Sequence, residues 1–91
     1  MNKKRNRLEV IHSILSVIVQ NRNSIKPTPL LRYSNLSSQR FNEYIKELVD
    51  KEFIKEIVDK DGRRIYSVIN KGFLFLERFE SIKKFISDFD L

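Results

Sequence analysis

The 91-residue sequence contains no cysteine, a single histidine and only two glycines. The absence of cysteine excludes disulfides, thiolate zinc sites and cysteine nucleophiles. His12 has no second histidine with which to share a metal ion, so we expect its role to be structural. Gly62 and Gly72 are too few and too far apart to form a phosphate-binding loop. The sequence therefore indicates neither an enzyme nor a cofactor or metal site.

Long apolar runs are missing as well. No stretch approaches the ~20 consecutive apolar residues that span a bilayer. The basic start is followed by an apolar segment that Glu9, His12 and Ser13 interrupt. Such interruptions do not fit the apolar part of a signal peptide. We therefore expect a cytoplasmic protein without a membrane partner.

The net charge of +6 is unevenly distributed along the chain. Residues 1–70 hold 14 basic and 8 acidic side chains, whereas residues 71–91 hold four of each. The whole surplus of positive charge therefore belongs to the first 70 residues. A positively charged body favours a polyanionic partner. The alternative is that these charges only keep the protein in solution, which would give the same excess of basic residues.

The length predicts one small domain covering residues 1–91. Within it we expect a basic arm at residues 1–7, a folded body at 8–70 and a final helix at 71–91. Apolar residues recur at three- and four-residue steps from about Asn6 to Gln20. This period predicts a first helix that is central to the core.

Two more helices are expected in the first half of the chain. Thr28 can cap a short second helix with Pro29 at its first position, and this helix ends near Tyr33. Ser37 then caps a third helix that extends to about Lys51. The short connection between the two helices is typical of a helix-turn-helix.

A β-hairpin follows the third helix. The β-rich runs Phe53–Val58 and Ile65–Ile69 flank a turn that contains Asp61-Gly62. From Lys71 to about Phe89 the apolar residues again recur with the period of a helix. The predicted fold class is α+β and mostly helical: a winged helix-turn-helix with three helices and a hairpin wing, followed by a C-terminal dimerisation helix. Such a fold presents its third helix to the major groove of DNA and its wing to the minor groove or backbone.

Exposed polar residues at the start of the third helix fit base recognition, because Arg can pair with guanine and Gln or Asn with adenine. Arginines at the wing tip and basic residues of the arm fit phosphates or a narrow minor groove. The alternatives are an ordinary solvated helix face and charges that protect an exposed hairpin. The predicted DNA contacts are Ser37, Ser38, Gln39, Arg40, Asn42, Lys46, Arg63, Arg64, Lys3, Lys4 and Arg5.

The last helix carries an apolar seam whose members are spaced four, three, four and three residues apart, as in a coiled coil. The seam predicts a homodimer interface formed by Phe75, Phe79, Ile82, Ile86 and Phe89. Phe73, Leu74 and Leu76 lie to one side, where they can dock on the winged body. The alternative is that the whole helix folds back on its own domain.

Three segments give the chain a resemblance to a known family. They are Arg7–Ile11, the run Ser34–Ser37 with Tyr44–Leu48, and Tyr66–Val68 followed by Lys71-Gly72. Because of these segments, the chain resembles archaeal and archaeal-virus winged helix-turn-helix regulators that dimerise through a C-terminal antiparallel coiled coil. That family often has a threonine cap where this chain has Ile69, so Asn70 is the expected cap of the last helix.

These features predict a dimeric, sequence-preferring, double-stranded DNA-binding protein that regulates transcription in association with DNA. Two alternatives remain open. One is a non-specific, chromatin-organising DNA binder of the same fold. The other is a winged helix used for protein–protein contact, with incidental charge.

Overall fold

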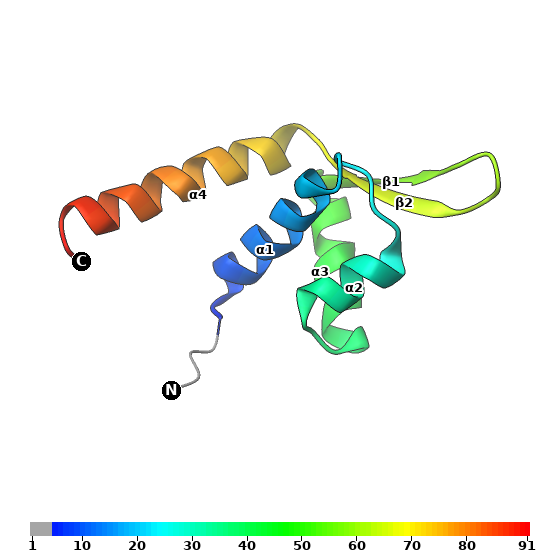
Figure 1. Cartoon of the computed structure of the whole chain (residues 1–91), viewed down its shortest axis with the longest axis horizontal. Coiled ribbons are helices and arrows are strands. Elements are labelled where there is room, and N and C mark those ends of the chain that lie inside the picture. Colours follow the sequence, from blue (N-terminus) through cyan, green and yellow to red (C-terminus); the bar gives the residue numbers. More distant parts are fainter. Residues whose placement is uncertain (1–4) are drawn as a thin grey trace.

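The computed structural model describes residues 5–91, so Lys3 and Lys4 of the predicted arm lie outside the described residues. Three helices are followed by a hairpin and a long helix (Figure 1). In chain order these are α1 (Arg7–Gln20), α2 (Pro27–Ser34), α3 (Ser38–Asp50), β1 (Ile54–Val58), β2 (Arg64–Val68) and α4 (Asn70–Asp88). The first three helices gather beside the base of the hairpin, whereas α4 extends away from them. The α+β, mostly helical architecture that the sequence predicts is confirmed.

Side-chain caps fix the starts of α1 and α3. At α1, Asn6 Oδ1 accepts from the Glu9 N–H at 2.8 Å, and Glu9 Oε1 accepts from the Asn6 N–H at 3.1 Å. This reciprocal pair is a capping box. At α3, Ser37 Oγ accepts from the Arg40 N–H at 3.2 Å. Both starts agree with the sequence prediction.

The predicted caps of the other two helices are wrong. Helix α2 has Lys26 at its N-cap position and begins at Pro27, so Thr28 lies inside the first turn. Pro27 is already suited to the first helical position, because its ring sets φ and its missing N–H would have no partner there. Helix α4 has Ile69 at its N-cap position, without a side-chain bond, and Asn70 is already helical.

The core lies between α1 and the other elements of the winged body. Its fully buried members come from all three helices and both strands: Val10, Ile14, Leu15, Ile18, Leu30, Leu48, Ile54 and Val68. Helix α1 supplies four of the eight, in agreement with the prediction that it is central. This shared core holds the outer face of α3 and the hairpin in a fixed relation.

The hairpin pairs from Ile54 opposite Val68 to Val58 opposite Arg64. A short extended segment before α2 joins it: the Ile25 N–H donates to the Tyr66 carbonyl at 3.2 Å, and the Tyr66 N–H donates back at 2.8 Å. The hairpin is therefore anchored at its base to the connection between α1 and α2.

Helix α4 begins by packing closely on the winged body. Gly72 is buried, and a Cβ there would lie 2.2 Å from the Phe53 carbonyl oxygen. Phe75 and Leu76 also pack against the core. Phe73 and Leu74, which the sequence places beside the body, remain nearly half exposed. From Glu80 onward every residue is exposed, so the second half of α4 projects from the body.

Candidate nucleic-acid interface

Helix α3 separates an apolar inner face from a polar outer face. Phe41, Tyr44, Ile45 and Leu48 are buried. Every predicted contact of this helix and its cap is exposed: Ser37, Ser38, Gln39, Arg40, Asn42 and Lys46. The Arg40 guanidinium lies 5.9 Å from the centre of the Tyr44 ring, a cation–π distance. The outer face therefore presents hydrogen-bond donors and acceptors to solvent.

The turn before α3 is fixed by local hydrogen bonds. Asn35 adopts a left-handed conformation with φ of 58°. The buried Ser34 hydroxyl donates to the Leu31 carbonyl at 2.7 Å and accepts from the Leu36 N–H at 3.3 Å. These contacts set how α3 leaves the turn, and thus where its first residues point.

The end of the basic arm lies beside this turn. Arg5 Nη2 donates to the Ser34 carbonyl at 2.6 Å. Arg5 and Arg40 line the same hollow of about 310 Å³, together with Val10, Asn35 and Leu36. Two guanidinium groups from distant parts of the sequence are thereby brought to the amino end of α3.

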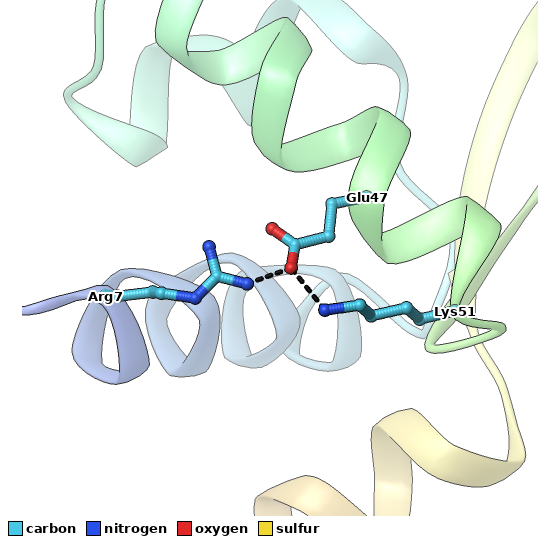
Figure 2. Close-up of polar contacts among 3 residues, drawn as sticks. All are labelled: Arg7, Glu47 and Lys51. Atoms are coloured by element: carbon cyan, nitrogen blue, oxygen red, sulfur yellow. Dashed lines mark hydrogen bonds and ion pairs between the residues drawn. The ribbon is translucent and has the colours of Figure 1, made fainter.

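Sequence reasoning missed an ion-pair cluster on the flank of α3. The Glu47 carboxylate pairs with Arg7 of α1 and with Lys51, the latter at 2.6 Å (Figure 2). Its negative charge is thus compensated from two sides. The four-residue spacing of Glu47 and Lys51 could have predicted their ion pair from the sequence. The pairing with Arg7 could not be predicted in this way, because Arg7 lies forty residues away along the chain. Arg7 also lines a hollow of about 210 Å³ with Arg40, Glu43, Tyr44 and Glu47.

The two wing arginines have different surroundings. Arg63 is exposed in the turn, where Asp59 Oδ1 accepts from the N–H groups of Asp61 and Arg63 at 2.9 Å. Arg64 is already the first residue of β2 and lies 3.7 Å from Glu56 across the hairpin. Burial, together with Glu56, raises the pKa of the neighbouring Tyr66, and Arg64 partly opposes this shift.

The predicted seam of α4 divides into two parts. Phe79 stacks on the His12 ring at 4.4 Å, and His12 Nε2 lies 2.9 Å from Glu80 Oε1. Phe75 stacks on Phe79 in turn, at 5.7 Å. Ile82, Ile86 and Phe89 are exposed. A groove of about 430 Å³ between α1 and α4 is lined by Phe79, Ile82 and Ile86 from the seam and by Leu8 and His12 from α1, among others.

Residues 5–91 contain no cluster of three or more His, Cys, Asp or Glu side chains that could hold a metal ion. In that part of the chain no helix is long and apolar enough to cross a membrane.

Three packed helices followed by a two-stranded wing define the winged-helix class. The sequence model of the winged helix-turn-helix family matches residues 4–87, and the chain belongs to this family. Among solved structures it is similar to Sso10a-2, a DNA-binding protein from Sulfolobus solfataricus, with a TM-score of 0.74 and 20% identity over 93% of this chain and 85% of that chain. It is also similar to F93 from STIV, a winged-helix DNA-binding protein, with a TM-score of 0.72 and 22% identity over 89% of this chain and 92% of that one.

These two neighbours confirm the resemblance to archaeal and archaeal-virus winged-helix proteins. At such identities they establish the shared fold. A search of curated proteins gives no significant match.

Proposed function

We propose that the protein binds double-stranded DNA as a homodimer and regulates transcription. The observation that carries this proposal is the open polar face of α3, with Arg5 and Arg40 at its amino end. It belongs to the part of the chain that holds all the surplus positive charge. The two solved neighbours are DNA-binding proteins of the same fold, which supports the same class of partner.

In this proposal α3 enters the major groove by its amino end. Gln39, Arg40 and Asn42 then face base edges, where their side chains can form paired hydrogen bonds. Ser37, Ser38 and Lys46 contact the flanking phosphates. The ion pairs of Glu47 limit repulsion from the phosphates on the flank of the helix.

The hairpin and the arm supply contacts outside the major groove. Arg63 and Arg64 lie at the end of the hairpin that projects furthest from the helices (Figure 1). From there they reach the backbone or the adjacent minor groove. Arg5 contacts phosphate beside the start of α3, and Lys3 and Lys4 extend that contact.

The exposed seam of α4 joins two such bodies. Ile82, Ile86 and Phe89 form an apolar strip on a helix that projects into solvent. A second copy of the strip covers it and brings a second α3 to the same duplex. Two bodies related in this way read half-sites about 34–36 Å apart, or a multiple of that spacing.

Selection from random duplexes, followed by sequencing, tests the function directly. A regulator enriches a two-fold symmetric motif, and its affinity for that motif exceeds its affinity for a scrambled duplex. With six to ten phosphate contacts, affinity should fall roughly 10³–10⁵-fold between about 50 and 200 mM salt. Tight binding without an enriched motif would instead identify a chromatin-organising protein. Absence of binding at low salt would refute DNA as the partner and favour protein–protein contact.

A further inference from the structure

An apolar side chain is exposed near the end of the wing. Val58 is the last residue of β1 and is 62% exposed, although valine is usually buried. It pairs with Arg64, the first residue of β2. Residues directly opposite each other in an antiparallel pair point to the same face of the hairpin. The wing therefore presents an aliphatic and a cationic side chain beside one another, outside the core.

The face of the hairpin that carries Val58 is the one turned toward the helices. Side chains alternate along a strand, so Val58 points to the same side as Ile54, four residues earlier. Ile54 is buried in the core, and α3 packs against β1. Figure 1 shows that the hairpin continues well beyond the helices. A duplex that contacts α3 and the wing together would pass along this side and meet Val58 and Arg64.

The turn beyond Val58 is fixed by hydrogen bonds among its own residues. The Asp59 N–H donates to the Arg63 carbonyl at 2.8 Å, and the Gly62 N–H donates to the Asp59 carbonyl at 3.0 Å. The Asp59 carboxylate accepts from two further N–H groups of the turn. The end of the wing is thus held in one shape, so Val58 can meet another surface without first losing much conformational freedom.

The charge at this end of the wing is nearly balanced. Residues 58–64 contain three basic and two acidic side chains, which is a net charge of only +1. Arg64 also lies 3.7 Å from Glu56, so part of its charge is compensated. Attraction to phosphates alone is therefore weak here, and an apolar side chain gains nothing from a phosphate. The combination fits the minor groove, where apolar side chains and arginines both make contacts.

The floor of the minor groove distinguishes base pairs by one group. A·T pairs present only acceptors there, whereas guanine adds the N2 amino group as a donor. A valine methyl group placed against that amino group would leave it without a hydrogen-bond partner, which is unfavourable. We infer that Val58 is a specificity-determining residue that lies in the minor groove beside Arg64 and selects against guanine. This inference rests on the DNA binding proposed above.

Two synthetic duplexes of equal length test the contact: one of alternating inosine and cytosine, the other of alternating guanine and cytosine. Inosine lacks the N2 amino group but keeps the major-groove atoms of guanine, so α3 meets the same pattern in both. Wild-type protein should bind the inosine duplex roughly five- to tenfold more tightly than the guanine duplex at one fixed salt concentration. Binding to both duplexes with a ratio below about twofold would overturn the inference.

Two variants show whether Val58 causes the difference. Val58→Ala should reduce the ratio to below about twofold, because the methyl groups that crowd the amino group are gone. Val19→Ala, at an exposed valine near the end of α1, is the matched control and should keep the wild-type ratio. If Val58→Ala keeps that ratio too, another residue reads the minor groove and the inference is wrong. Absence of binding to both duplexes at low salt would refute DNA as the partner, and the inference with it.

The salt dependence of binding gives a second measurement. Val58 carries no charge, so Val58→Ala should leave the slope of log affinity against log salt concentration unchanged. Arg64→Ala removes one cation and should reduce the steepness of that slope by about one. A shallower slope for Val58→Ala would show that this change moves the charged side chains of the wing, and it would overturn the assignment of the discrimination to Val58.

Discussion

The side chain of Asn23 forms two hydrogen bonds with the backbone of Val68. Its Nδ2 donates to the Val68 carbonyl at 3.0 Å, and its Oδ1 accepts from the Val68 N–H at 2.7 Å. The Ser67 hydroxyl donates to the Asn23 carbonyl at 2.7 Å. The connection between α1 and α2 therefore pairs with β2 much as a third strand would, partly through a side chain.

This pairing makes Asn23 a test of the hairpin anchor. Asn23→Ala should lower the free energy of unfolding by about 2–4 kcal/mol, since two buried backbone groups of Val68 lose their partners. The left-handed φ of 55° at this position adds to the cost. Asn23→Gly keeps that conformation accessible, so it isolates the hydrogen bonds. Chemical denaturation checks both variants, and a loss below about 0.5 kcal/mol in both would contradict the anchoring role.

The contacts of α3 and of the wing should differ in what they contribute to DNA binding. Gln39→Ala or Arg40→Ala should weaken a selected site by roughly 1–3 kcal/mol more than a random duplex, because paired hydrogen bonds to bases are lost. Arg63→Ala with Arg64→Ala should weaken both duplexes more evenly. Fluorescence anisotropy at one fixed salt concentration measures these losses. Equal losses on both duplexes for Gln39→Ala would show that this side chain does not read a base.

The Arg7–Glu47 pair gives a prediction about charge compensation. Arg7→Ala should weaken binding to every duplex roughly 3- to 10-fold at low salt, because the Glu47 carboxylate keeps only Lys51 as its partner near the phosphates. Glu47→Gln in the same chain should restore most of the affinity. If the double variant binds as weakly as Arg7→Ala alone, Arg7 acts by touching phosphate itself.

The exposed seam should be required for dimerisation. Ile82→Glu puts a charge at its centre, where neither water nor a partner group can compensate it in the dimer. We expect a monomer in sedimentation experiments, with DNA affinity greatly reduced because the second body no longer binds at high effective concentration. Lys84→Glu, on the outer side of the same helix, is a suitable control. A variant that stays dimeric would place the interface elsewhere, and α1 would be the next element to test.

Tyr66 should contribute to alkaline unfolding. Its pKa is raised in the folded protein, chiefly by burial. The unfolded chain therefore loses this proton at lower pH than the folded chain does, and stability falls as the pH rises through and above about 10. Tyr66→Phe should show a smaller decrease in unfolding free energy over this range. An unchanged decrease would mean that other groups dominate alkaline unfolding.

Local signals in the sequence account for much of the fold. Asn6 and Ser37 are side-chain caps followed by periodic apolar residues, and both helix starts are predictable from them. Thr28 and Asn70 carry the same chemistry but are not caps, because Pro27 and the packing of Gly72 against the hairpin begin those helices earlier. A capping residue is informative only where tertiary contacts do not move the boundary.

The candidate site was predictable in a more limited way. The exposure of Gln39 and Arg40 follows from the helical period around Phe41. The pairing of Arg7 with Glu47, and of His12 with Glu80, joins residues forty and sixty-eight positions apart. Such pairs depend on the angles at which the helices cross, which apolar spacing does not specify. The DNA and dimer contacts of individual residues remain predictions.

Gly72 lies close to the Phe53 backbone, and this contact bears on the DNA site proposed above. The Ile69 N–H also donates to the Phe53 carbonyl at 3.0 Å, so the direction in which α4 leaves the body is set by one short backbone contact. Helix α4 has 19 residues and is therefore about 28 Å long. A tilt of roughly 10° at Gly72 would displace its far end by about 4 Å, more than the ~3.4 Å rise of one base pair. If the protein binds as the proposed dimer, we expect the absence of a side chain at position 72 to influence how many base pairs separate the two half-sites.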